Sequence, residues 1–164
     1  MIEAQFEFIR LARLLNEEGV KFMVIGGFAV NHYGYSRNKA DIDVYVKDSE
    51  ENRKALVEAL DLMGYGRMDA LLRVPIIAGY CEIMMDDGFY VDLMTSIPGL
   101  DPNDYDVQFE RRKINLIEGV QIPYINFNDL VVNKKATGRP KDLEDCAQLE
   151  RIGGNTNRLN QEPQ

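Results

Sequence analysis

The stretch Val24–Val46, VIGGFAVNHYGYSRNKADIDVYV, decides the fold of this chain. It places a glycine pair, Gly26-Gly27, directly after a short apolar run. Further along, Asp41 and Asp43 stand on either side of a single isoleucine within an apolar strand pattern. Because side chains alternate between the two faces of a β-strand, this spacing puts both carboxylates on the same face.

Two ionised carboxylates this close repel each other, and one would normally take up a proton. A divalent cation removes that conflict, and Mg²⁺ prefers oxygen ligands from carboxylates together with substrate phosphates. The glycine pair complements such a site. Gly26 and Gly27 lack Cβ atoms, so the backbone can approach a ligand closely. A strand-to-helix turn also directs free N–H groups at an anion such as a triphosphate.

A third carboxylate occurs in the apolar pattern FYVDLMTS, where Asp92 lies between Val91 and Leu93. A buried aspartate needs a partner that compensates for its desolvation. If this strand lies beside the strand 41–46, Asp92 joins Asp41 and Asp43. Three such groups suffice to hold two metal ions, the arrangement that supports in-line phosphoryl or nucleotidyl transfer.

Around this centre, hydrophobic periodicity and turn residues predict alternating helices and strands, followed by hairpins. The predicted helices are 2–18, 28–33, 49–63, 126–135 and 140–152. The predicted strands are 21–25, 41–46, 80–85, 89–95, 113–117 and 120–124. Residues 65–79 are predicted to be buried and extended. We therefore expect an α+β fold with a mixed β-sheet flanked by helices, one domain over residues 1–152, and a polar, flexible tail over 153–164.

The chain of 164 residues is long enough to bury a core without disulfides or a structural metal. Its two cysteines form neither a metal-binding spacing nor a disulfide framework. The formal net charge of −8 disfavours sequence-specific binding of duplex DNA. The N-terminal segment lacks the features of a signal peptide, and no apolar run reaches the roughly 18 residues of a membrane span. We expect a cytoplasmic protein without a membrane partner.

The order Gly26-Gly27, Arg37, Asp41-Ile42-Asp43 and Asp92 resembles the nucleotidyltransferase superfamily, which has the DNA-polymerase-β-like fold. The runs GGFAVNHYGYSRNKADIDVYV, VDLMTSIPG and DLVVNKKATGRPKDLEDC are similar to small bacterial proteins of the AbiEii and minimal-nucleotidyltransferase group. The resemblance covers residues 5–152, and its C-terminal block does not depend on the aspartates.

The resemblance implies Mg²⁺-dependent transfer of a nucleoside monophosphate from a nucleoside triphosphate to a hydroxyl of an unidentified acceptor, with pyrophosphate as the leaving group. The catalytic residues, which would also bind two Mg²⁺ ions, are Asp41, Asp43 and Asp92. The residues expected to bind the nucleotide are Gly26, Gly27, Arg37 and Lys39. Gly27 stands where many members have serine, and Lys39 where close relatives have threonine, so a hydroxyl contact to phosphate is missing.

Two other functions stay open on the sequence. The chain could retain the fold as a non-catalytic interaction module, such as a toxin–antitoxin component, because it shows no second domain of substrate-binding size. It could instead be a small antibiotic nucleotidyltransferase. Besides the nucleoside triphosphate, the expected partners are therefore a protein or RNA acceptor, or a toxin–antitoxin partner.

Each candidate residue also has a simpler structural explanation. Asp41 and Asp43 could be solvated residues of an edge strand, Asp92 could pair with a lysine, and Arg37 could pair with Asp41. The glycine pair could be only a tight turn. Tyrosines near the site could stack on a base or pack in the core; they are Tyr33, Tyr35 and Tyr45. A basic island could belong to a helix C-terminus or reach triphosphate or a nucleic-acid acceptor; its members are Lys134, Lys135, Arg139 and Lys141.

Overall fold

The structure, a computed structural model, describes residues 6–37 and 41–159. Its helices are α1 (Phe6–Glu17), α2 (Gly26–His32), α3 (Glu50–Met63), α4 (Tyr105–Glu110), α5 (Phe127–Thr137) and α6 (Pro140–Leu159). Its strands are β1 (Phe22–Ile25), β2 (Asp41–Val46), β3 (Glu82–Met84), β4 (Tyr90–Met94), β5 (Lys113–Ile117) and β6 (Val120–Tyr124). Two short 3₁₀ turns are η2 (Asp69–Leu72) and η3 (Pro102–Asp104).

The strands form one mixed sheet in the order β3-β4-β2-β1-β6-β5. β1 pairs antiparallel with β2 and parallel with β6, and β2 pairs parallel with β4. The antiparallel hairpins β3–β4 and β5–β6 form the two edges of the sheet. The predicted α+β architecture with a mixed sheet and flanking helices is therefore confirmed.

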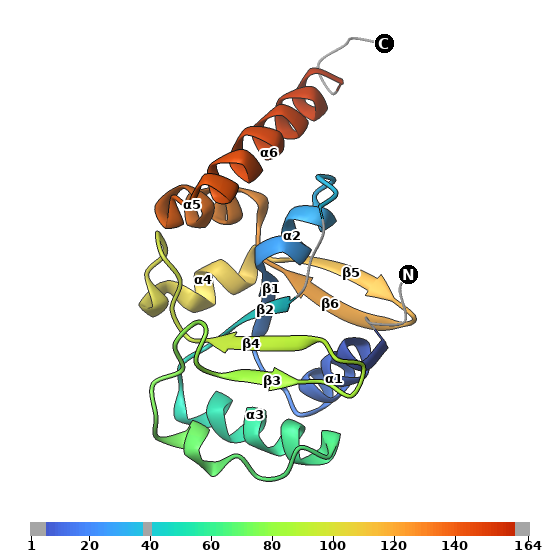
Figure 1. The fold of residues 1–164 in the computed structure, drawn as a ribbon, viewed down its shortest axis with the longest axis vertical. Coiled ribbons are helices and arrows are strands. Elements are labelled where there is room, and N and C mark those ends of the chain that lie inside the picture. The colour runs from blue at the N-terminus through green and yellow to red at the C-terminus, as the bar shows by residue number, and fades with distance from the viewer. Residues whose placement is uncertain (1–5, 38–40, 160–164) are drawn as a thin grey trace.

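The alternation of side chains along β2 separates the core from the polar face. Ile42, Val44 and Val46 are buried, whereas Asp41 is exposed and Asp43 is half-buried. Figure 1 shows α1 and α3 on one side of the sheet and α2, α4 and α5 on the other. The apolar face packs under α1 and α3, and both carboxylates lie on the face that α2 and α5 border.

Residues 65–79 do not form the predicted buried, extended segment. They contain the 3₁₀ turn η2 and a loop, in which Ile76 is buried but Val74 and Ile77 are exposed. The prediction was wrong because apolar composition alone does not distinguish a strand from a loop that is anchored through hydrogen bonds to one residue. Here the Ile76 carbonyl accepts hydrogen bonds from both the backbone N–H (3.0 Å) and the side-chain hydroxyl (3.1 Å) of Thr95.

Two helix boundaries also differ from the prediction. α2 begins at Gly26 instead of residue 28, immediately after β1. α6 continues through Leu159 instead of ending near Ile152, so the first seven residues of the predicted tail are helical. Gly153 does not stop α6, and a Cβ atom built there would lie 3.0 Å from the ring of Phe127. The glycine therefore permits close packing at this point in the helix. Within the described residues, no helix is both long and apolar enough to cross a membrane.

Candidate active site

Asp43 and Asp92 lie opposite each other on the neighbouring strands β2 and β4. Their Cα atoms are register partners, as are those of Asp41 and Tyr90. Residues paired in this way project to the same face of a sheet, so the two carboxylates stand side by side. The predicted placement of the Asp92 strand beside 41–46 is confirmed, and β2 is not an edge strand.

The carboxylate of Asp43 lies against the backbone of Gly26. Gly26 has a φ of +63°, and a Cβ atom built on it would lie 2.0 Å from Asp43 Oδ2. Ile25 is the register partner of Asp43 on β1, so the start of α2 is brought directly beside this aspartate. A side chain at position 26 and the present position of the Asp43 carboxylate therefore exclude each other.

Asp92 presents one satisfied and one unsatisfied oxygen. The residue is only 8% exposed, and its Oδ2 accepts a hydrogen bond of 2.7 Å from the backbone N–H of Gly79. Oδ1 is buried without a hydrogen-bond partner. A buried carboxylate oxygen in this state has a desolvation cost that a ligand can offset.

Both paired aspartates hold their protons more tightly than usual. Burial, followed by the charge of Asp92, raises the pKa of Asp43 to about 6, although Lys134 and Arg139 oppose the shift. Burial is also the largest cause that raises the pKa of Asp92, and the Gly79 hydrogen bond opposes it. Close carboxylates in a partly desolvated site resist losing both protons, and a cation between them reverses this.

A pocket of about 460 Å³ opens over the two aspartates. Gly26, Asp43 and Asp92 line it from the sheet, and Lys134 and Arg139 line it from the α5–α6 region. The sheet side of the pocket is therefore acidic, and the α5–α6 side carries two cations together with Asp142. Carboxylates facing cations across a cavity suit a ligand that combines a metal ion with phosphate groups.

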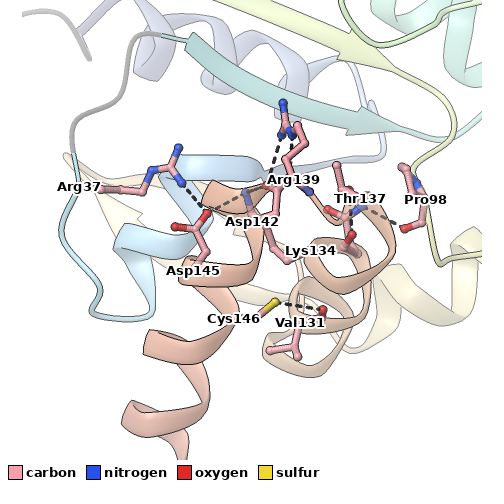
Figure 2. Close-up of polar contacts among 10 residues, drawn as sticks. Arg37, Pro98, Val131, Lys134, Thr137, Arg139, Asp142, Asp145 and Cys146 are labelled. Carbon is pink, nitrogen blue, oxygen red and sulfur yellow. Dashed lines mark hydrogen bonds and ion pairs between the residues drawn. The ribbon is translucent and has the colours of Figure 1, made fainter.

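The cations of this wall belong to a network that the sequence did not reveal. Lys134 is 4% exposed, and its Nζ lies 2.9 Å from Asp142 Oδ1 and 3.0 Å from Asp145 Oδ2. Arg139 Nε donates to Asp142 Oδ2 at 2.6 Å. Figure 2 shows both basic side chains directed at these α6 carboxylates. One available signal was the spacing of Asp142 and Asp145, which places them on one face of a helix.

The basic island thus divides into two parts. Lys134 and Arg139 line the pocket, whereas Lys135 pairs with Glu150 outside it, and Lys141 is exposed. Two tyrosines considered for base stacking pack instead. Tyr45 is fully buried against Tyr105, and the Tyr33 hydroxyl donates to the Ile125 carbonyl.

Three other predicted site residues are not among the described residues that line the pocket: Gly27, Arg37 and Asp41. Asp41 is exposed on the same face as Asp43. Arg37 pairs with Asp145 of α6, not with Asp41 as its simpler explanation supposed. Its guanidinium passes Gly27, where a built Cβ atom would lie 3.6 Å from Arg37 Nε. Lys39 falls outside the described residues. Within residues 6–37 and 41–159, no three acidic, histidine or cysteine side chains are arranged to hold a metal ion.

Replacing Gly26 by alanine is expected to cost about 1 to 2 kcal/mol of stability, because alanine disfavours a positive φ. It should also displace the Asp43 carboxylate and weaken binding of Mg²⁺. Thermal denaturation and a Mg²⁺ titration measure the two effects. Gly27→Ala is the matched control: its new methyl group meets ordinary contacts. Equal behaviour of the two variants would contradict the assigned role of Gly26.

The mixed sheet with its flanking helices has the fold of the nucleotidyltransferases. The chain belongs to the family described as "Nucleotidyl transferase of unknown function (DUF2204)", whose model matches residues 5–162. None of the curated proteins matches this sequence.

Two solved structures are similar in fold. One is the lincosamide antibiotic adenylyltransferase LnuA with bound lincomycin, at 15% identity and a TM-score of 0.54, with 89% of this chain and 96% of that chain covered. The other is described as a "putative nucleotidyltransferase" from Thermotoga maritima, at 16% identity and a TM-score of 0.53, with 99% and 97% covered. At these identities the likeness concerns the fold alone.

Proposed function

We propose that the protein is a Mg²⁺-dependent nucleotidyltransferase that transfers a nucleoside monophosphate from a nucleoside triphosphate to an acceptor hydroxyl. The observation that carries this proposal is the pairing of Asp43 with Asp92 beneath a pocket whose far wall holds Lys134 and Arg139. The buried, unpartnered Oδ1 of Asp92 and the raised pKa of Asp43 both fit a divalent cation.

In this proposal Asp43 and Asp92 would hold Mg²⁺, and Asp41, which is exposed on the same face of β2, would supply a further carboxylate when a second ion binds with the triphosphate. The metal would polarise the transferred phosphoryl group and neutralise its charge. Gly26 leaves room for the Asp43 carboxylate, and its backbone borders the pocket. Lys134 and Arg139 face the triphosphate and offset the charge of the departing pyrophosphate. The Gly79 N–H holds the Asp92 carboxylate in place.

Isothermal titration with ATP, CTP, GTP and UTP in the presence of Mg²⁺ tests this function. We expect the wild type to bind at least one of them, and Asp92→Asn to lose at least 10-fold in affinity, because it removes a charged metal ligand. Asp41→Ala/Asp43→Ala should abolish Mg²⁺-dependent binding. The proposal fails if the wild type binds no nucleotide, or if these variants bind as well as the wild type.

A small-molecule hydroxyl is the first acceptor class to examine. LnuA, an adenylyltransferase of lincosamide antibiotics, is matched over 96% of its length. An adenylyltransferase of this kind can therefore be built largely from the fold described here. Pyrophosphate release during incubation with candidate hydroxyl compounds would identify the acceptor, and an RNA or protein acceptor would give release with those substrates instead.

A second candidate is a nucleotidyltransferase-fold interaction module, such as the toxin–antitoxin component suggested by the AbiEii resemblance. It is favoured by the edge strand β5, on which Ile114 is 46% and Leu116 66% exposed. Exposed apolar side chains on an unpaired strand edge suit addition of a partner strand. Robust transferase activity of the isolated protein would count against this role.

A further inference from the structure

We infer that Arg37 is a positioning residue that sets the charge of the triphosphate-binding wall without touching the triphosphate. It acts by neutralising Asp145, which leaves Lys134 and Arg139 with an unbalanced positive charge toward the pocket. This inference rests on the proposed function of the pocket. It replaces the expectation that Arg37 binds phosphate directly.

The contacts form a continuous chain. Arg37 Nη1 donates to Asp145 Oδ2, and the same oxygen lies 3.0 Å from Lys134 Nζ. Lys134 in turn donates to Asp142 Oδ1 at 2.9 Å, and Arg139 Nη2 donates to that oxygen at 3.2 Å. The chain can be followed in Figure 2 from Arg37, through Asp145 and Lys134, to Asp142 and Arg139.

Burial makes this chain of contacts electrostatically coupled. The side chains of Asp145, Asp142 and Lys134 are 2%, 0% and 5% exposed, so water screens their charges poorly. Asp142 illustrates the strength of the coupling. Burial acts to raise its pKa, but hydrogen bonds from Arg139 and Lys134 outweigh this and hold the pKa at about 2. Asp142 is therefore ionised at neutral pH. Asp145 is held in ion pairs with Arg37 and Lys134, so both acidic side chains offset positive charge on this side of the pocket.

The charge count then depends on Arg37. Three cations (Arg37, Lys134, Arg139) face two carboxylates (Asp142, Asp145) in this network, which leaves one positive charge in excess. Without Arg37 the count becomes two against two, and the wall is neutral. Lys134 and Arg139 line the same pocket as Asp43 and Asp92, so the excess positive charge of this network borders the pocket.

The position of Arg37 argues against a direct contact with the ligand. Arg37 precedes β2 and is not among the described residues that line the pocket, whereas Lys134, Arg139 and Asp142 are. Its side chain is 24% exposed and its guanidinium is engaged by Asp145. A phosphate in the pocket would meet Lys134 and Arg139, which lie between it and Arg37 in the chain of contacts.

Neutralising charges within the network distinguishes a positioning role of Arg37 from direct contact with phosphate. The probe is inorganic tripolyphosphate, titrated by calorimetry with and without Mg²⁺, which requires no acceptor. Arg37→Gln is expected to bind it about 10-fold more weakly, the order expected for one charge lost at close range in a poorly screened site. Arg37→Gln/Asp145→Asn restores the excess of one and should regain wild-type affinity. Asp145→Asn alone should bind more tightly than the wild type.

The affinity of the double variant Arg37→Gln/Asp145→Asn for tripolyphosphate is the decisive measurement. If Arg37 contacted phosphate itself, removing Asp145 could not restore binding, so an Arg37→Gln/Asp145→Asn variant as weak as Arg37→Gln overturns the positioning role. Wild-type affinity in Arg37→Gln also overturns it. Arg37→Lys keeps the charge and should bind like the wild type, and thermal melts verify that each variant is folded. Failure of the wild type to bind tripolyphosphate with or without Mg²⁺ rejects the proposed pocket function itself.

Discussion

Replacing Lys134 by alanine is expected to lower the free energy of unfolding by about 3 to 5 kcal/mol, the range observed when one partner of a buried ion pair is removed. Lys134 is 4% exposed and bridges two carboxylates whose side chains are at most 2% exposed, Asp142 and Asp145. Its loss leaves both with one ion-pair partner fewer in a region where water screens charges poorly. Chemical denaturation at pH 7 measures the change.

The neighbouring residue provides the control for this prediction. Lys135 lies on the same helix, but its ion pair with Glu150 joins two half-exposed side chains. Exposed pairs contribute about 0 to 1 kcal/mol, so Lys135→Ala should change stability by no more than that. Similar losses in the two variants would show that the buried network does not have the assigned importance.

Lys134→Ala also distinguishes stability from binding. Asp142→Asn/Asp145→Asn introduced together with Lys134→Ala removes the two carboxylates that have lost a partner and should recover most of the lost stability. Because the pocket would still lack the Lys134 ammonium, tripolyphosphate binding should not recover to the same extent. Recovery of neither property would indicate that Lys134 supports the helix pair through packing alone.

The strands of the sheet were predictable because their hydrophobic patterns and turn residues favour the same elements that the folded structure contains. The period of two in β2 sends Ile42 and Val44 to the core and Asp43 to the polar face. The Asp-Gly and Glu-Gly turns produce the expected hairpins β3–β4 and β5–β6. The apolar pattern around Asp92 predicted a strand, and the pairing of that strand with β2 confirms the expected position of Asp92 beside Asp43.

The two cations that line the pocket, Lys134 and Arg139, were only partly predictable. The sequence draws attention to a basic island, but nothing local distinguishes Lys134 from Lys135, and the first is buried while the second is exposed. Their difference arises from how α5 packs against α6, which is a tertiary property. The partner of Arg37 is 108 residues away, and Gly79 contributes only a backbone N–H. Neither contact can be recognised from a pattern of residues in the sequence.

The conflict between stability and function at Asp43 leads to the second large effect. We expect Asp43→Asn to stabilise the metal-free protein at pH 7 by about 2 to 3 kcal/mol, since each pKa unit corresponds to about 1.4 kcal/mol. The folded protein raises the pKa of Asp43 from 3.8 to about 6, chiefly by burial, so the ionised carboxylate opposes folding. Asparagine has nearly the same shape and carries no charge.

The pH dependence fixes the sign of this prediction. Because the native state binds the Asp43 proton more tightly than the unfolded state, the wild type gains stability as pH falls through about 6 toward 4. Asparagine has no such proton, so the advantage of the variant should be full above pH 6 and vanish near pH 4. The same substitution at the exposed turn residue Asp86 should change stability by less than about 0.5 kcal/mol.

Magnesium should invert the order of the two proteins. A cation that binds the native state and not the unfolded state stabilises it by mass action, and only the wild type retains both paired carboxylates beneath the pocket. Thermal melts in EDTA and in Mg²⁺, each from pH 4 to pH 8, therefore test the role of Asp43 in two ways. The melts in EDTA measure the cost of its buried charge, and the melts in Mg²⁺ measure its contribution to metal binding. If the variant is less stable than the wild type in EDTA at pH 7, the ionised Asp43 carboxylate does not oppose folding as inferred. An equal response of both proteins to Mg²⁺ would contradict the metal site.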